Sequence, residues 1–386
     1  MEIKKVNNLF ICHRPYHVVV SAHIINHNIQ NSNKTVKNTC VLLDVPVFNK
    51  NTSPGGQISF DELTNSSSLN KIDYIHFDHL YRLEKIFDKV LKINRSEEVR
   101  IWNIFKFKEY YKSLIRNIKK IFSNSELNSI NNIYIFSDKE KPVEIIASIL
   151  KEKYSSKVFL VDEGIVSYYK NKSYFKSLIK RFIVKAFRLK YISNSMAYGH
   201  SGINDYFLTF DKKDVINQKN IIQLPILDSV EYKHIFKDQY PTVGDNTALF
   251  ISNALSEGNV LSIEDEKLFI TKIISELIFL GYNVLIKPHP VEVKWKFIFL
   301  DKAKMVKIMK ESSLPVEMLF NDNNIKILTG VTSSALLNAK RNNKVAISFI
   351  KYLNEDHPII DIYQKNEILM PINSIELKNC VINALQ

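Results

Sequence analysis

The chain has 386 residues, 45% of them hydrophobic and 24% charged, which is the composition of a folded globular protein of about two domains and excludes disordered, collagen-like and coiled-coil chains. Its 53 Lys and Arg against 40 Asp and Glu leave a net charge of +13, which favours an anionic partner: nucleic acid, a membrane surface, or a phosphorylated or acidic substrate. With 9 glycines and no match to either pattern, the chain is not expected to hold a P-loop or a dinucleotide-binding loop.

The first half of the chain alternates short apolar runs with helix-like segments, the pattern of an α/β protein with parallel sheets. Strands are predicted at residues 9–12, 39–44, 133–137 and 157–161, and a helix at residues 143–153. The polar segment 49–70, with Pro54-Gly55-Gly56 near its start, is predicted to be a loop over one edge of this domain.

The second half repeats this alternation, with predicted strands at residues 248–252, 283–287, 325–328 and 345–349 and a helix at residues 264–280. Residues 228–245 combine charged clusters with Pro241 and Gly244, so we place the boundary there and expect domains of residues 1–240 and 241–386. Rossmann-like domains bind ligands beyond the carboxyl ends of their strands. The residues that follow each strand are therefore the candidates for chemistry.

An acidic pair, Asp162 and Glu163, follows the strand at 157–161 and precedes Gly164. A glycine permits a sharp turn here, which would place one acid in the crevice while the other braces the loop. The crevice acid would serve as a general base if burial or a like charge raised its pKa. A solvated turn is the competing interpretation, because acidic residues are mostly exposed.

The sequence Lys287-Pro288-His289-Pro290 stands at the end of the strand at 283–287. Two prolines restrict the backbone on either side of His289. A cationic or proton-donating histidine beside a lysine suits a phosphate leaving group. A rigid surface turn explains the same residues equally well.

Hydroxyl side chains follow the strand at 325–328, where Thr332, Ser333 and Ser334 precede a helix-like segment. Hydroxyls and unbonded backbone N–H groups at a helix N-terminus form an anion site, although a plain serine cap is the simpler interpretation. Upstream, Glu317 follows Pro315 and would accept hydrogen bonds from both hydroxyls of a ribose. The start of a surface helix explains Glu317 equally well.

Together, the Asp162-Glu163-Gly164, His289-Pro290 and Ser333-Ser334 motifs resemble those of bacterial sialyltransferases, in the expected order and divided between the expected halves. The chain looks most similar to glycosyltransferase family 52, the lipooligosaccharide and capsule sialyltransferases. Residues 10–17 and 255–258 are similar to that group as well.

This resemblance implies a metal-independent α/β fold of GT-B type, in which two Rossmann-like domains face a central cleft. It implies transfer of sialic acid from CMP-sialic acid with inversion, no cofactor, and a donor bound mainly by the C-terminal domain. By analogy His289 would contact the CMP phosphate and protonate it as it leaves, and Glu317 would hold the ribose. The remaining donor-binding residues implied are Lys287, Pro290, Thr332, Ser333 and Ser334.

The same resemblance leaves the general base open between the Asp162-Glu163 pair and Glu257, which lies in the first loop of the C-terminal domain. The implied acceptor is a terminal sugar of a surface glycan, with galactose expected. Four residues after the first strand would line the acceptor side of the cleft: His13, Arg14, Tyr16 and His17. Pro15 at the first turn of the next helix offers an equally good structural explanation.

A basic segment from Lys170 to Lys190 holds eight Lys or Arg and no acid. On a helical wheel its apolar side is Phe175, Leu178, Ile179, Phe182 and Ala186, and its basic side is Lys176, Lys180, Arg181, Lys185 and Arg188. Such a helix can lie on an anionic membrane leaflet. It can equally pack on the domain with a solvated basic face.

Three rivals to this assignment are a family-52-like transferase for another nucleotide sugar, a polysialyltransferase, and a basic nucleic-acid-binding protein. The last is least favoured, because the chain contains no recognised nucleic-acid-binding module. Scattered Cys12, Cys40 and Cys380 predict neither a disulfide framework nor a zinc site, and no metal is expected. We expect a cytoplasmic protein, or one peripheral to the inner face of the membrane, and a homodimer is compatible with the sequence.

Overall fold

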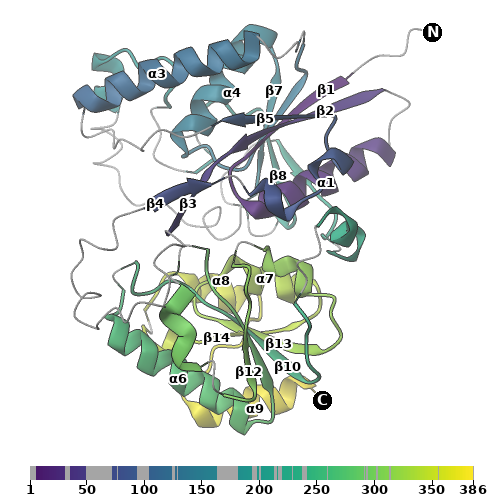
Figure 1. Cartoon of the computed structure of the whole chain (residues 1–386), viewed down its shortest axis with the longest axis vertical. Coiled ribbons are helices and arrows are strands. Elements are labelled where there is room, and N and C mark those ends of the chain that lie inside the picture. The colour runs from purple at the N-terminus through teal and green to yellow at the C-terminus, as the bar shows by residue number, and fades with distance from the viewer. Residues whose placement is uncertain are drawn as a thin grey trace. The chain divides into compact units, whose positions relative to one another are not determined.

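The computed structural model divides into two compact units, which are described separately (Figure 1). Unit 1 comprises Met1–Asp44 and Tyr81–Leu227, and unit 2 comprises Val45–Leu80 and Asp228–Gln386. The structure describes residues 6–30, 35–48, 72–75, 77–93, 104–123, 127, 129–162, 181–193, 198–199, 201–212, 215, 220–227, 229–236, 241–258, 260–290, 292, 294–300, 303–312, 314–354 and 356–385.

This division differs from the expected domains in two respects. The change of unit falls at Leu227 and Asp228 instead of at residue 240, and the segment Val45–Leu80 belongs to unit 2 although its neighbours in sequence belong to unit 1. Within that segment β3 (Val45–Phe48) and β4 (Ile72–Ile75) form an antiparallel pair outside both large sheets. The predicted loop at 49–70 lies outside the described residues.

Unit 1 contains a parallel sheet of seven strands in the order β5-β2-β1-β6-β7-β8-β9. The strands are β1 (Val6–Cys12), β2 (Val36–Leu43), β5 (Lys89–Ile93), β6 (Asn132–Ile135), β7 (Lys157–Val161), β8 (Tyr206–Thr209) and β9 (Ile221–Gln223). The helices of this unit are α1 (Pro15–Gln30), α3 (Ile104–Ser123) and α4 (Lys141–Tyr154), with the 3₁₀ turn η3 (Leu83–Lys85).

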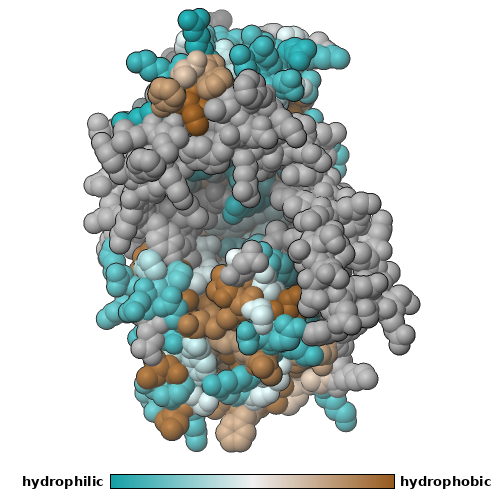
Figure 2. All heavy atoms as spheres, turned by 90° about the vertical axis from the view of Figure 1, so that its left-hand side faces the viewer, coloured by the Kyte–Doolittle hydropathy of each residue, from teal (hydrophilic) through white to brown (hydrophobic). Residues whose placement is uncertain are grey.

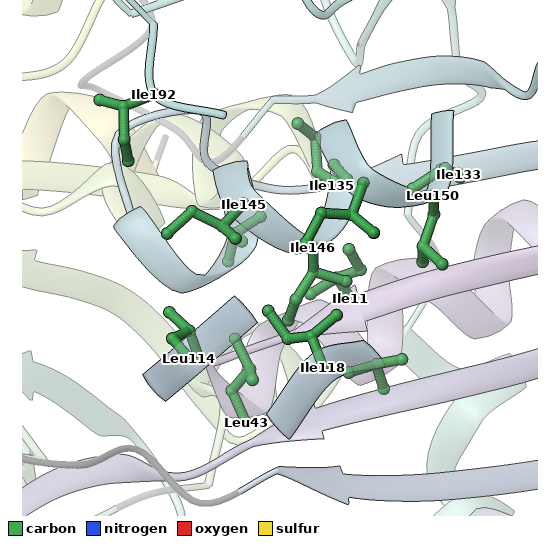
Figure 3. Close-up of a cluster of buried hydrophobic side chains, with 14 of the residues drawn as sticks. Ile11, Leu43, Leu114, Ile118, Ile133, Ile135, Ile145, Ile146, Leu150 and Ile192 are labelled. Carbon is green, nitrogen blue, oxygen red and sulfur yellow. The ribbon is translucent and has the colours of Figure 1, made fainter. Parts of the chain in front are cut away.

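The core of unit 1 lies where α3 and α4 cover one face of this sheet (Figure 3). Ile11 of β1 and Ile133 of β6 pack with Ile146 of α4 and Ile118 of α3, and all four side chains are fully buried. Central parallel strands are covered on both faces, which is why they read as continuous apolar runs in the sequence.

Unit 2 contains a parallel sheet of five strands in the order β12-β11-β10-β13-β14. The strands are β10 (Thr247–Ile251), β11 (Asn283–Lys287), β12 (Val306–Ile308), β13 (Ile325–Gly330) and β14 (Val345–Ser348). The α-helices are α6 (Ile263–Phe279), α7 (Ser334–Arg341), α8 (Ile359–Lys365) and α9 (Ser374–Leu385). The 3₁₀ helices are η2 (Asp78–Leu80), η6 (Ser229–Ile235), η7 (Lys294–Leu300), η8 (Val316–Leu319) and η9 (Ile350–Tyr352).

The second core forms where α6 and α9 pack on this sheet, through Ile273, Leu277 and Leu377. On the outward side of α6, Leu268 and Phe279 are 70% and 85% exposed. Figure 2 shows apolar atoms of unit 2 gathered on the surface of one face. Among the described helices, none combines the length and the apolar content that crossing a bilayer requires.

All eight predicted strands and both predicted helices overlap elements of the structure, so the expected α/β class with two parallel sheets is confirmed. Strand order reverses direction between β1 and β6 in unit 1 and between β10 and β13 in unit 2. In open parallel sheets ligands bind at the carboxyl ends of the strands beside such a reversal.

Candidate active site

The carboxyl ends of β10, β11 and β13 lie side by side in unit 2, because these strands pair in parallel. The loops that follow them carry most of the predicted donor-binding residues. Lys287 ends β11 and His289 follows it, while Thr332 and Ser333 follow β13. Three separate stretches of sequence therefore meet at one edge of the sheet.

Asn253 ties the first of these loops to the last. Its side-chain oxygen accepts hydrogen bonds from the backbone N–H groups of Val331 at 3.0 Å and Thr332 at 3.3 Å, and its amide nitrogen donates to the Thr332 carbonyl at 3.1 Å. Gly330 allows this close approach, since a Cβ there would lie 3.0 Å from the carbonyl oxygen of Ile251. Asn253 was not among the residues predicted from the sequence, although a polar side chain directly after a buried strand is the signal that identifies it.

Ser333 caps the N-terminus of α7. Its backbone is extended, and its hydroxyl accepts a hydrogen bond from the Ala335 N–H at 3.3 Å. Its carbonyl accepts one from the Tyr363 hydroxyl at 2.9 Å, and Ser334 is the first helical residue. The predicted serine cap is therefore present, and the N–H groups of this helix terminus face the edge where anions are favoured.

Lys287 and Glu317 are buried beside this edge, at 5% and 7% exposure. The Lys287 ammonium donates to the carbonyl oxygens of Pro288, at 2.9 Å, and Ser312. Burial lowers the pKa of Lys287 to about 8, although Glu317 and other nearby carboxylates oppose that shift. Burial also raises the pKa of Glu317, whose carboxylate accepts a hydrogen bond from Asn338 at 3.3 Å.

The loop that carries His289 is held through its backbone. Pro288 is buried and Pro290 half-buried, while the side chain of His289 is exposed. The N–H of His289 donates to a carboxylate oxygen of Glu292 at 2.6 Å, and the N–H of Glu292 donates back to the His289 carbonyl at 2.9 Å. The imidazole therefore stands on a turn closed by two hydrogen bonds.

A buried ion cluster lies next to the loops that follow β10 and β11. The ammonium of Lys296 lies 2.8 Å from a carboxylate oxygen of Glu257, 2.6 Å from Glu266 and 3.0 Å from Glu292. Although burial opposes it, these carboxylates raise the pKa of Lys296. Three carboxylates this close together could hold a metal ion, but here an ammonium group contacts all of them. Of the residues in this cluster, only Glu257 was predicted from the sequence.

The candidate residues of unit 1 lie at the carboxyl ends of β7 and β1. Asp162 is buried, and its carboxylate accepts a hydrogen bond from the Thr209 hydroxyl at 3.1 Å. Glu163 lies outside the described residues.

His13 and His17 are buried as well, and His17 stacks on Phe136 with a ring separation of 4.2 Å. The imidazole of His17 accepts a hydrogen bond from the His13 N–H at 3.2 Å. Arg14 is exposed and Tyr16 half-buried. These four residues lie at the reversal between β1 and β6, and both histidine side chains are buried there.

In unit 2 the imidazole Nε2 of His79 lies 3.7 Å from a carboxylate oxygen of Glu311. Glu311 precedes Ser312, which accepts a hydrogen bond from Lys287. The segment Val45–Leu80 therefore supplies a histidine close to the carboxyl end of β11, a placement that sequence order does not indicate.

Comparison with known families decides the class of this site. The family model described as alpha-2,8-polysialyltransferase matches residues 8–348, a span that includes every motif above. The chain belongs to the alpha-2,8-polysialyltransferase family. Its members are glycosyltransferases of the sialyltransferase class, so the expected enzyme class is confirmed. The match does not confirm the expected membership of glycosyltransferase family 52, and it agrees with the polysialyltransferase rival that the sequence analysis retained.

Solved structures show the same architecture. A putative UDP-N-acetylglucosamine 2-epimerase from Listeria monocytogenes aligns with a TM-score of 0.56 and 8% identity, over 99% of this chain and 88% of the other. UGT89C1 of Arabidopsis thaliana, complexed with UDP-L-rhamnose, aligns with a TM-score of 0.53 and 11% identity, over 99% and 90%. The expected GT-B fold is thus confirmed for this member of the polysialyltransferase family.

An alpha/beta-galactoside alpha-2,3-sialyltransferase from Photobacterium phosphoreum aligns with a TM-score of 0.45 and 16% identity, over 99% of this chain and 96% of the other. No curated protein sequence matches the chain significantly.

The buried ammonium of Lys287 predicts a pH dependence of stability. Its folded-state pKa is about 8 against an ordinary value of 10.5, so between these values the unfolded chain binds this proton more tightly. The free energy of unfolding should therefore rise with pH across that window through this group. We expect Lys287→Met to flatten the rise relative to the parent, measured by urea unfolding from pH 7.5 to 10.5.

Lys304→Met, at an exposed lysine of the same unit, is the control and should keep the parent's slope. Equal slopes for Lys287→Met and the parent would show that Lys287 titrates normally in the folded state.

Proposed function

We propose that this enzyme transfers sialic acid from CMP-sialic acid to a terminal sugar of a surface glycan, with inversion at the anomeric carbon and without a metal. The family match carries the proposal, because it spans the acidic pair, His289 and Ser333. The structure supports it by bringing His289 and the serine-capped terminus of α7 to the same edge of one sheet.

The reaction most needs stabilisation of the negative charge that develops on the leaving phosphate. The acceptor oxygen forms a bond to the anomeric carbon as the bond from that carbon to the phosphate oxygen breaks, so negative charge builds on CMP. Fixed donors aimed at that charge stabilise the transition state more than the ground state. We assign this role to His289, as phosphate ligand and proton donor, and to the hydroxyls of Ser333 and Ser334.

We assign the remaining donor-binding roles to four further residues. Glu317 would hold the ribose and Lys287 would add positive charge beneath the phosphate. Pro290 and Thr332 would shape the two loops, since Thr332 is already fixed by Asn253.

For the acceptor, the family description favours a glycan that ends in sialic acid, joined through an alpha-2,8 linkage. Galactose, expected from the sequence resemblance, is the competing terminal sugar. His13, Arg14, Tyr16 and His17 would lie on the acceptor side.

For the general base, we favour the Asp162-Glu163 pair over Glu257. An oxygen of Glu257 accepts hydrogen bonds from Lys296 at 2.8 Å and from Ser256 at 3.3 Å, and its side chain is only 10% exposed. One oxygen of Glu257 is thus already occupied by two donors, and little of the side chain is accessible to an acceptor hydroxyl. The carboxylate of Asp162 accepts a hydrogen bond from Thr209 at the carboxyl end of β7, and we keep both members of the pair as candidates for the base.

Replacing the histidine tests the donor site. We expect His289→Ala to lower kcat with CMP-sialic acid by about a hundredfold or more, as loss of a general acid does, while the melting temperature stays that of the parent. His234→Ala, at another exposed histidine of unit 2, is the matched control and should keep parental activity.

The assay uses CMP-sialic acid and UDP-sugars as donors, and glycans ending in sialic acid or galactose as acceptors. Near-normal transfer by His289→Ala, or use of UDP-sugars alone, would contradict the assignment. Transfer only to glycans that end in galactose would change the proposed acceptor and leave the proposed donor and reaction unchanged.

Three isosteric substitutions test the base. We expect Asp162→Asn or Glu163→Gln to lower kcat by about a hundredfold, because loss of a positioned base has that effect. Glu257→Gln should keep most of the activity after correction for the folded fraction. A larger loss in Glu257→Gln than in both of the others would move the base to Glu257.

We also propose that unit 1 docks on an anionic membrane leaflet through its basic surface, which would bring the enzyme to a lipid-linked acceptor. In the described part of the segment, Ile183, Val184 and Leu189 are buried in the core, while Arg181 and Lys185 are exposed. Phe182 and Ala186 were expected on the apolar side and are exposed instead, because the neighbouring pair Ile183 and Val184 faces the core.

Phe182, 73% exposed among these bases, is suited to enter the interface. The outer face of α3 continues the basic surface with Lys108, Lys112, Arg116, Lys119 and Lys120. A hydrogen bond from the Tyr191 N–H to the Tyr111 hydroxyl at 3.1 Å joins α3 to this segment.

Vesicle binding tests the surface. We expect the enzyme to bind vesicles rich in phosphatidylglycerol, and to bind them more weakly as salt rises. At about 1 kcal/mol per base, Arg181→Ser combined with Lys185→Ser should weaken binding by about thirtyfold. The control Lys304→Ser with Lys378→Ser removes the same charge from unit 2 and should leave binding unchanged. Equal binding to neutral vesicles, or none to either, would refute the membrane role.

A further inference from the structure

Glu292 contacts both loops at the edge of β10 and β11. One of its carboxylate oxygens accepts the His289 N–H at 2.6 Å. The other accepts from the Ser252 hydroxyl at 2.5 Å and from the Ala254 N–H at 3.1 Å. The side chain is almost fully buried, so these bonds are shielded from water.

The bond to His289 restricts the loop more than an ordinary side-chain contact would. Proline has no backbone N–H, so His289 provides the only backbone donor between Pro288 and Pro290. The carboxylate of Glu292 accepts a hydrogen bond from that N–H, and the backbone N–H of Glu292 donates one to the His289 carbonyl. With the backbone held in this way, the position of the imidazole depends on its side-chain torsions alone.

Burial raises the pKa of Glu292, and the ammonium group of Lys296 opposes that shift. Lys296 stands four residues after Glu292 and lies 3.0 Å from it, and the same ammonium contacts Glu257 and Glu266. An ionised carboxylate accepts stronger hydrogen bonds than a neutral group. Both oxygens of Glu292 accept hydrogen bonds from the two loops, and the adjacent ammonium group favours the ionised form that makes these bonds strongest.

We propose that Glu292 is a positioning residue for His289: it fixes the backbone of the His-Pro loop against the loop after β10, and so sets where the imidazole meets the leaving phosphate. This inference rests on the proposed role of His289. Glu292 contacts no reacting atom, and its effect on the reaction passes through the histidine.

Glu266 provides a matched control. It is equally buried, it contacts the same ammonium at 2.6 Å, and it accepts two backbone N–H groups, from Leu255 at 3.1 Å and Ser256 at 2.9 Å. Both of those donors lie in the loop after β10. A substitution of Glu266 therefore disturbs the same ion cluster without removing the bond to His289.

The test is a double-mutant cycle on the full chain. We expect Glu292→Gln and Glu266→Gln to lower the melting temperature similarly, but Glu292→Gln alone to lower kcat by about tenfold or more, since small misplacement of a catalytic group has large effects. In a His289→Ala background, Glu292→Gln should change the residual kcat by less than about twofold, because residues that act as one unit are not additive.

The same fold loss in both backgrounds, or equal losses for Glu292→Gln and Glu266→Gln, would overturn the inference. Full activity of His289→Ala alone would instead overturn the proposed function. If Glu292→Gln does not fold, Glu292→Asp keeps the charge opposite Lys296 but shortens the reach to His289, and the same cycle applies.

Discussion

The ammonium group of Lys296 joins three buried carboxylates, and through them it connects α6 to the loops after β10 and β11. Glu266 lies in the first turn of α6, Glu257 follows β10, and Glu292 holds the loop of His289. Removing one partner of a buried ion pair typically destabilises a protein by about 3–5 kcal/mol, because the remaining charges are left without compensation. The geometry of the candidate donor site depends on this one cation.

At the same edge of the sheet, the loops after β10 and β13 are held together by close backbone packing. Asn253 satisfies three backbone groups after β13, and Gly330 leaves room for the carbonyl of Ile251. Serine-capped α7 then begins at the point where the strand order reverses. A nucleotide phosphate bound here would meet fixed N–H and O–H donors, which need little reorganisation as charge develops.

Sequence patterns predicted the central strands, because buried parallel strands read as apolar runs, and they predicted Ser333 as a cap, because that role needs only local residues. They did not predict the short strands β5, β8, β9 and β12, of which β5, β9 and β12 lie at the edges of their sheets. They missed Glu266, Glu292 and Lys296, since charged residues are presumed exposed until tertiary structure pairs them. The membership of Val45–Leu80 in unit 2 depends on contacts that sequence order does not contain.

Motifs and fold carry different information about function in this chain. The GT-B architecture is shared with a putative epimerase and with UGT89C1 at 8% and 11% identity, so it identifies neither donor nor acceptor. The family match supplies the sialyltransferase class. The central claim is that CMP binds at the carboxyl edge of β10, β11 and β13. A crystal structure with CMP tests it most directly: the account predicts the phosphate within about 3.2 Å of the His289 imidazole and the Ser333 hydroxyl, and a phosphate bound away from both would contradict it.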